Sequence, residues 1–242
     1  MIEKDIVLQN ILCELAQNKE FKENFAFKGG TCLIKCYLGY YRFSEDLDFT
    51  FVKQEEFKGK SEKQIRRALS EKISSLITSL EDIAVRLDLE FKGEKGNKKY
   101  IELGGSNRFV TFKLWYTSLV LGAPTFIKIQ INFIEKMIYA TKEFSPKFIL
   151  SEGSREIEFL FPKQAYLFQA PLLKVYDLRE ILIEKVRAIL TRKGRKARDF
   201  IDVFLVAGKI KIEPAELKAE ILAKTHFMLR YEKYRRNIKD KI

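Results

Sequence analysis

Hydrophobic and polar positions change their spacing along the chain, and these changes mark the elements that we expect. In residues 3–17, apolar side chains recur every three or four positions, which is typical of a helix packed through one face. The same spacing recurs from 61 to about 80, and Ser61 with Gln64 forms a capping box at the start of this segment. From 83 to 134 the period becomes two, which indicates strands. We expect these strands at 85–91, 109–116 and 126–133.

A glycine-rich segment separates two of these strands. Residues 104–107 read GGSN, which has the composition of a phosphate-binding loop. A strand rather than a helix is expected after it, so no helix dipole would face a bound phosphate. We therefore interpret the segment as a hairpin turn.

Residues 25–51 combine a strand, a glycine turn, a short helix and a second strand. Residues 25–27 indicate a short buried strand. Gly29 and Gly30 end it, because paired glycines permit backbone angles and close approaches that a side chain forbids.

A short helix is expected directly after this turn, because apolar residues follow at helical spacing. Its exposed amides would then lie at Gly30 and Thr31, where N–H groups and the helix dipole favour a phosphate. Lys28 and Lys35 would add positive charge there.

Asp46 and Asp48 are expected to point to the same side of the next strand, because Leu47 and Phe49 alternate with them. Carboxylates held this close repel each other unless a cation joins them. Mg²⁺ is commonly held by one or two carboxylates together with phosphate oxygens. An Asp-x-Asp pair alone also fits a solvated strand face, but Gly-Gly-Thr followed by Arg-x-Ser-x-Asp-x-Asp favours a metal site.

The segments KGGTCLIK and RFSEDLDF together resemble the first motif of the AbiEii/AbiGii-type toxin family, a branch of the polymerase-beta-like nucleotidyltransferases. The resemblance implies that the glycine pair and the hydroxyl residue hold a nucleoside triphosphate. It also implies that Asp46 and Asp48 bind Mg²⁺ or Mn²⁺ and are catalytic. The nucleotide-binding residues expected in this motif are Lys28, Gly29, Gly30, Thr31, Lys35, Arg42 and Ser44.

Polymerase-beta-like enzymes commonly carry a third carboxylate on a strand beside the Asp-x-Asp pair. The predicted strand near residue 130 presents Lys128, Gln130 and Asn132 on its polar face. If it is the neighbour, the third acid is missing and Gln130 or Asn132 is a neutral substitute. If the strand of Asp88 and Glu90 is the neighbour, one of those two supplies the acid.

Residues 177–207 predict a helical hairpin, in which Lys185 lies inside the apolar stripe of the first helix between Ile181 and Ile189. Burying an unpaired ammonium group is costly, so Lys185 should face an acid or an anion. The alternative is a lysine that extends along the helix edge into water.

The second helix of this hairpin has Arg198, Asp199 and Asp202 together, opposite an apolar face. Asp199 also lies in the first turn, where an acid complements the helix dipole. A basic loop joins the two helices and is suited to a triphosphate or an RNA backbone, although such residues also favour helix C-termini. Its basic residues are Arg192, Lys193, Arg195 and Lys196.

The segment REILIEKVRAILTR, followed by ARDFIDVF, is similar to a second motif of the same toxin family. The resemblance implies that Lys185 contacts the triphosphate or the attacking group and that Asp199 is the catalytic acid of a second lobe. Arg198 and Asp202 would be its nucleotide-binding neighbours. The two motifs would close one cleft, so activity would require both lobes.

Charge and cysteine content bear on the partner and on the cellular compartment of the protein. The net charge of +12 suits a polyanionic partner such as RNA, although lysine-rich surfaces also arise from compositional bias. The three cysteines favour a reducing compartment, and we expect them to be buried small hydrophobes. The N-terminus lacks a secretory pattern, and no apolar run reaches the roughly 18 residues of a membrane helix. We expect a cytoplasmic protein.

Together these patterns predict an α+β fold, with a nucleotidyltransferase-like mixed or antiparallel sheet, helices and a C-terminal helical lobe. We expect lobes at 1–163 and 164–242. The expected activity is transfer of a nucleoside monophosphate from an NTP to an acceptor hydroxyl, with RNA such as tRNA as acceptor. The resemblance implies a toxin of a toxin–antitoxin or abortive-infection pair, with an antitoxin as partner. The alternative is a non-catalytic RNA- or partner-binding descendant of the fold.

Overall fold

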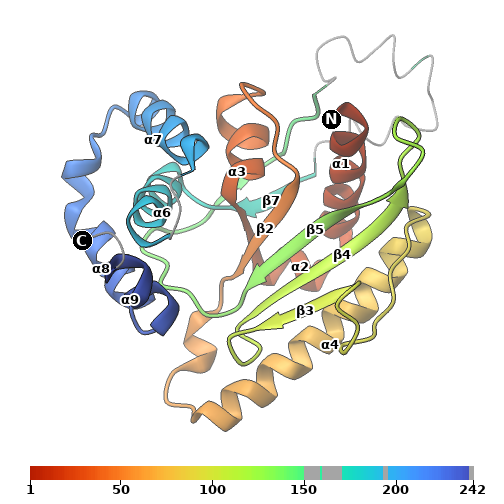
Figure 1. Cartoon of the computed structure of the whole chain (residues 1–242), viewed down its shortest axis with the longest axis horizontal. Coiled ribbons are helices and arrows are strands. Elements are labelled where there is room, and N and C mark those ends of the chain that lie inside the picture. Colours follow the sequence, from red (N-terminus) through yellow and green to blue (C-terminus); the bar gives the residue numbers. More distant parts are fainter. Residues whose placement is uncertain (150–158, 160–170, 193–195, 240–242) are drawn as a thin grey trace. The chain divides into compact units, whose positions relative to one another are not determined.

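β1 (Phe25–Lys28) and β2 (Asp46–Phe51) form the centre of a seven-stranded mixed sheet with the order β3-β4-β5-β2-β1-β7-β6 (Figure 1). β2 is antiparallel to β1 and parallel to β5 (Pro124–Asn132). The predicted fold class is therefore confirmed. The remaining strands are β3 (Ile101–Gly104), β4 (Phe109–Thr117), β6 (Lys142–Phe144) and β7 (Leu173–Val175).

The structure is a computed structural model that describes residues 1–149, 159, 171–192 and 196–239. The chain divides into two compact units. The first comprises Met1–Ile134 and Glu143–Val175, and the second comprises Glu135–Lys142 and Tyr176–Ile242. The boundary that the sequence predicted near residue 163 lies outside the described residues.

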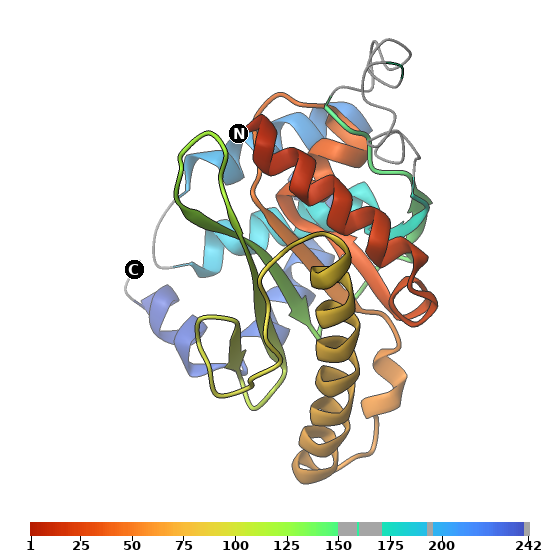
Figure 2. The ribbon, with the colours of Figure 1, turned by 90° about the vertical axis from the view of Figure 1, so that its right-hand side faces the viewer.

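Helices cover one face of the sheet in the first unit. These helices include α1 (Ile2–Gln17) and α4 (Glu62–Arg86), which lie on the same side of β3, β4 and β5 in both views (Figures 1 and 2). α2 (Lys19–Asn24) adds Phe21, whose ring centroid lies 4.8 Å from that of Phe49 on β2. The apolar face of the sheet is thereby removed from water, which stabilises the unit.

Alternating burial over residues 46–49 of β2 separates this core from the opposite face. Leu47 and Phe49 are at most 1% exposed, whereas Asp46 and Asp48 are half-buried. Because successive side chains of a strand point to opposite faces, both carboxylates lie on the face away from the apolar core. The predicted alternation is confirmed over residues 46–49, while Thr50 beyond them is also buried.

The short helix after β1 is also present. It begins as α3 (Gly29–Cys32) and continues as a π-helix, η1 (Leu33–Leu38). The three cysteines of the chain are buried and form no disulfide, as the sequence predicted.

The strand predicted at 85–91 is wrong. α4 has the predicted capping box but continues through Arg86, and Val85 on its outer side is 82% exposed. The helix extends because Ile83 and Ala84 are buried. Within the described residues, this segment joins the sheet only through an isolated bridge from Glu90 to Trp115.

The hairpin predicted at 104–107 is confirmed, since this segment joins β3 to β4. Gly105, Ser106 and Asn107 all have positive φ, of 56°, 55° and 69°. Polar and glycine residues tolerate this region best, which explains the composition without a ligand.

The second unit contains the predicted helical hairpin, α6 (Leu178–Thr191) and α7 (Ala197–Ile210). Asp177 caps α6, because its carboxylate accepts a hydrogen bond of 2.8 Å from the Arg179 N–H. η4 (Pro214–Leu217), α8 (Lys218–Met228) and α9 (Glu232–Lys239) complete the unit; α6 packs against both α7 and α8. In the described part of the chain, every helix is too short or too polar to cross a membrane.

A buried lysine joins three segments of this unit. Lys224 of α8 is 2% exposed, and its ammonium lies 2.6 Å from Glu180 and 3.4 Å from Glu135. Glu180 also accepts hydrogen bonds from the N–H groups of Ile138 and Tyr139. These contacts hold residues 135–142 against α6 and α8.

Candidate active site

Asp46 and Asp48 stand on one face of β2 between charged and polar neighbours. In the parallel pairing with β5, Asp46 is beside Lys128 and Asp48 is beside Gln130. On the other side of β2, Lys28 of β1 pairs with Asp48. Register partners present their side chains on the same face, so two lysines accompany the two carboxylates.

The glycine turn approaches these side chains closely. Gly29 has φ +77°, and a Cβ on it would lie 2.3 Å from Oδ2 of Asp48. A Cβ on Gly30 would lie 2.6 Å from Nη2 of Arg42. Gly29 therefore requires glycine, whereas the atom nearest a Cβ on Gly30 is the end of the flexible Arg42 side chain, which can move aside. The turn backbone lies directly against the side chains of the Arg-x-Ser-x-Asp-x-Asp motif.

Thr31 holds the start of α3 against β2. Its hydroxyl donates to the carbonyl oxygen of Asp46 and lies 2.8 Å from the hydroxyl of Ser44. Thr31 is only 2% exposed. The hydroxyl group is thus engaged within the protein, and the structure brings Thr31, Ser44 and the aspartates together as the sequence predicted.

Lys35 is placed elsewhere than predicted. Its ammonium lies 2.8 Å from Asp5 and donates hydrogen bonds to Gln9 and Tyr40. Burial lowers the pKa of Lys35, and the Asp5 carboxylate opposes that shift. Since Lys35 is 1% exposed and already faces an acid, it is not retained as a phosphate ligand.

The strand beside the Asp-x-Asp pair is β5, which answers the question of the third acid. Its polar positions next to β2 are Lys128, Gln130 and Asn132, and none is a carboxylate. The amide of Gln130 lies 3.4 Å from the hydroxyl of Thr111 on β4. The alternative acids lie outside the named strands: Asp88 is in the turn after α4, and the backbone of Glu90 joins the sheet through an isolated bridge to Trp115, away from β2.

The donor set at this face is therefore two carboxylates. Among the residues that the structure describes, no three His, Cys, Asp or Glu side chains gather as a metal cluster. Two carboxylates on one face still fit Mg²⁺, since that ion is commonly bound by one or two carboxylates, with waters and substrate phosphates as its other ligands.

In the second unit, Lys185 faces acids. Its ammonium lies 2.6 Å from Oδ2 of Asp202 and 3.1 Å from Oδ1 of Asp199. The Lys185 side chain is 13% exposed and the two aspartates at most 3%. The prediction of acidic partners is confirmed, and the alternative of a lysine extended into water is wrong.

Arg192 completes this cluster, with Nη1 2.5 Å from Oδ2 of Asp199. One carboxylate thus faces both Lys185 and Arg192. Arg198 and Lys196 of the predicted site are exposed, while Lys193 and Arg195 lie outside the described residues.

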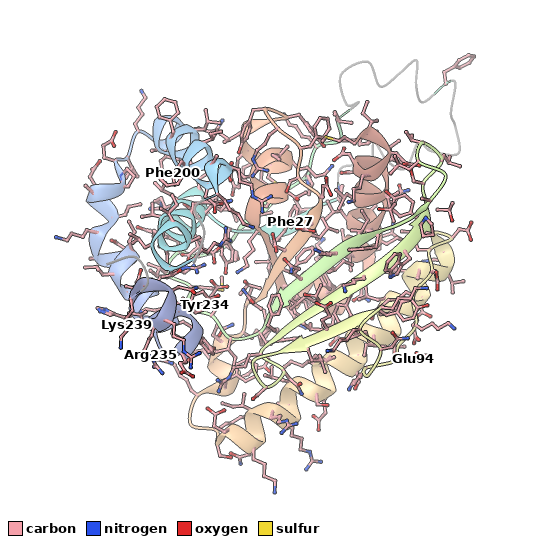
Figure 3. The ribbon with its side chains drawn as sticks, viewed as in Figure 1. Phe27, Glu94, Phe200, Tyr234, Arg235 and Lys239 are labelled. Carbon is pink, nitrogen blue, oxygen red and sulfur yellow. The ribbon has the colours of Figure 1, made fainter. Side chains whose placement is uncertain are left out.

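α7 buries its acidic face. Asp199 and Asp202 are at most 2% exposed, whereas Phe200 and Phe204 on the opposite face are 45% and 77% exposed (Phe200 is labelled in Figure 3). The helix is thus held through ion pairs rather than through its aromatic residues.

The sequence alone did not indicate that Lys128 lies beside Asp46. The alternation of residues 126–132 placed Lys128 on a polar face, but the partner of that face depends on a pairing between distant segments.

The chain is similar to two solved structures from Helicobacter pylori. One is JHP933, with 16% identity, a TM-score of 0.43 and coverage of 84% of this chain and 63% of that chain. The other is a candidate nucleotidyltransferase, with 17% identity, a TM-score of 0.44 and coverage of 85% and 67%. The chain thus spans less than two thirds of the length of JHP933.

No curated protein matches the sequence. A family model described as the nucleotidyl transferase AbiEii toxin of type IV toxin–antitoxin systems matches residues 10–241, so the chain belongs to the AbiEii family.

Proposed function

We propose that the protein transfers a nucleoside monophosphate from an NTP to a hydroxyl group of an RNA such as tRNA, with Mg²⁺ or Mn²⁺. The observation that carries this proposal is the contact of the Gly29 turn with Asp48, on the face that also holds Asp46. A backbone turn against paired carboxylates suits a triphosphate bound through a divalent cation. Such a toxin would act in the cytoplasm, where NTPs and RNA occur, and its expected partner is a cognate antitoxin.

Asp46 and Asp48 would hold the cation, with triphosphate oxygens as its other ligands. The cation would supply neutralisation of the charge that develops on the phosphate during transfer. The remaining work belongs to the protein, because phosphoryl transfer depends mainly on positioning and electrostatic stabilisation.

The N–H groups of Gly30 and Thr31, together with Arg42 and Lys28, would bind the β- and γ-phosphates. The acceptor hydroxyl oxygen attacks the α-phosphorus and forms a new P–O bond. The bond from the α-phosphorus to the bridging oxygen breaks, and pyrophosphate leaves. The hydroxyl proton passes to a carboxylate of the Asp46–Asp48 pair.

Lys185 would contribute a positive charge toward the triphosphate or the attacking group, as its motif implies. The motif implies that Asp199 is catalytic, but its carboxylate contacts both Lys185 and Arg192. We therefore propose that Asp199, like Asp202, acts as a positioning residue for the Lys185 ammonium. The reaction would then require residues of both units.

A labelled-transfer assay tests the proposal. The full chain is incubated with Mg²⁺, total RNA and each α-labelled NTP; we expect label in RNA from at least one NTP. Asp48→Ala should abolish transfer, whereas Asp82→Ala, on the exposed side of α4, should leave it unchanged. No transfer by the parent, or full transfer by Asp48→Ala, contradicts the proposal. Label from γ-labelled NTP instead would indicate a phosphotransferase.

A second candidate function is favoured by Gln130, which occupies the register position beside Asp48 where a third acid would stand. In this case the protein binds RNA or a partner without catalysis. Retained RNA binding, with no NTP-dependent shift of the melting temperature in Mg²⁺, would support this candidate over the enzyme.

A further inference from the structure

Two aromatic side chains pair across β4 and β5 at the sheet surface. Trp115 and Phe126 are register partners, with ring centroids 4.6 Å apart and an interplanar angle of 53°. Both residues are partly exposed. The indole N–H of Trp115 donates to the carbonyl oxygen of Lys99 at 2.9 Å, which fixes the orientation of the ring.

The aromatic pair lies on the face that carries the carboxylates. Two residues along the strands, Lys113 pairs with Lys128, and Lys128 pairs in turn with Asp46. Side chains two positions apart share a face and are separated by about 7 Å along the strand. Phe126 is therefore one row of side chains from the row that contains Asp46.

This part of the hairpin extends past the start of β2. The pairing of β2 with β5 begins at Asp46 and Lys128, so Phe126 has a strand partner on the β4 side only. The rings of Trp115 and Phe126 thus stand beside the carboxylates on an extension that β2 does not flank.

Three lysines surround these rings. The ammonium of Lys99 lies 5.5 Å from the Trp115 centroid, and those of Lys113 and Lys128 lie 5.8 Å and 5.7 Å from the Phe126 centroid. Two of the lysines also form ion pairs, Lys113 with Glu102 and Lys99 with Glu90.

The surface around the rings carries a net positive charge despite the two glutamates. The side chains of Glu90 and Glu102 are 52% and 51% exposed. Ion pairs to such exposed carboxylates contribute little to stability, so a phosphate can replace the glutamates. Among the residues that the structure describes, none forms an ion pair with Lys128. The cluster of three lysines and two glutamates therefore favours an anion beside the aromatic rings.

We infer that Trp115 and Phe126 form a stacking surface for an unpaired base of a single-stranded RNA acceptor, whose phosphates contact Lys113 and Lys128. An aromatic cross-strand pair alone would only stabilise the hairpin. Rings flanked by lysines are the combination that binds single-stranded nucleic acid, because every base offers a π-face. The inference rests on the proposed function, in which a hydroxyl of the same RNA reacts at the neighbouring carboxylates.

The protein contains its own probe, because Trp115 is the single tryptophan of the chain. Titration of the full chain with a ten-nucleotide single-stranded RNA, without NTP or divalent cation, should quench Trp115 fluorescence. Phosphate contacts to the two lysines predict a log–log salt slope of about −1.4 for a single strand. A fully paired RNA hairpin should quench far less, since its bases are not free to stack.

Variants are compared through the anisotropy of the same RNA carrying a fluorophore. Phe126→Leu should weaken binding at least about fivefold, and Lys128→Ala should reduce the salt slope by about 0.7. Lys58→Ala is the matched control, because Lys58 is an exposed lysine of the same unit that also pairs with a glutamate, Glu55 at 2.5 Å. It should leave RNA binding unchanged.

The inference is overturned if RNA leaves Trp115 fluorescence unchanged, or if Lys128→Ala binds RNA with the parent's affinity and salt slope. It is also overturned if ATP alone, without metal, quenches as strongly as the RNA, since the surface would then hold the base of the NTP. Quenching by RNA without nucleotide transfer would support the stacking surface and reject the proposed activity. Nucleotide transfer that is undiminished in Phe126→Leu and Lys128→Ala would support the proposed activity and reject the stacking surface.

Discussion

The backbone of Gly29 lies against the carboxylate of Asp48 so closely that a methyl group on Gly29 would be 2.3 Å from Oδ2. The glycine turn and the carboxylate are far apart along the chain, but the antiparallel pairing of β1 with β2 brings them together. The position of Asp48 is therefore coupled to the turn that is proposed to bind phosphate.

Gly29→Ala should both strain the backbone at φ +77° and displace Asp48. We expect a loss of about 1–3 kcal/mol in the free energy of unfolding, together with loss of the Mg²⁺-dependent shift in melting temperature. Gly59→Ala is the matched control, because Gly59 has φ +70° but nothing within 4 Å of an added Cβ. Equal effects of the two variants on the Mg²⁺-dependent shift would show that Gly29 does not act through Asp48.

Lys185→Met should leave Asp199 and Asp202 buried without their shared cation. Breaking a buried ion pair by removing one partner costs about 3–5 kcal/mol, so we expect a loss near the lower end because Arg192 still faces Asp199. Urea unfolding measures it. The double variant Lys185→Met/Asp202→Asn should regain part of the stability but none of the transfer activity. Recovery of activity in the double variant would contradict the role proposed for the lysine.

Lys35→Met in combination with Asp5→Asn should leave transfer activity per folded molecule unchanged, because the buried pair faces the interior and not the phosphate. Lys28→Met, at the register position beside Asp48, should instead lower kcat/KM. Steady-state kinetics with the labelled NTP compare the two. A similar loss of kcat/KM in both variants would indicate that Lys35 does bind the phosphate.

Phe204→Ser should change the free energy of unfolding by less than about 0.5 kcal/mol, because the side chain is 77% exposed. Val206→Ser on the same helix is the comparison, since Val206 is 0% exposed and its loss should cost about 2 kcal/mol or more. Chemical unfolding of both variants tests which face of α7 is buried. A larger loss from Phe204→Ser would mean that the aromatic face is covered.

Asp177 gives a pH dependence with a definite sign. Burial raises the pKa of this carboxyl, but hydrogen bonds from Arg179 and Lys142 outweigh burial and lower it to about 2. Since the folded state holds the proton less tightly than the unfolded state, the stabilisation is present above pH 3.8 and is lost as the pH falls toward 2.

Asp177→Asn should therefore be less stable than the parent by about 1 kcal/mol at pH 7, and the difference should shrink between pH 4 and pH 2. Thermal unfolding across this range measures it, with Asp82→Asn as the control that shows no such convergence. A difference that persists unchanged at pH 2 would contradict the assignment.

Local features of the fold could be predicted from the sequence because neighbouring residues determine them. The alternation along β2, the capping box of α4 and the glycine turn follow from the period of apolar residues and from backbone sterics. The same holds for Lys185, because a lysine inside an apolar stripe requires an acidic partner wherever that stripe is buried.

The remaining features depend on contacts between distant segments. The pairing of β2 with β5 placed Gln130 and Lys128 beside the aspartates, and no local pattern encodes which strands become neighbours. Burial of Ile83 and Ala84 extended α4 through residues whose alternation resembled a strand. Lys35 lies on the face of its helix that packs against Asp5, so its direction was decided by α1.

The sequence by itself thus determined the central strands, most of the helices and the two motifs with their residue types. The tertiary structure decided which faces are buried, which strands adjoin the carboxylates and which lysines remain near the site. The physical reason is that burial and strand pairing lower the free energy only when segments far apart in the chain come into contact. A local pattern is compatible with several such tertiary arrangements.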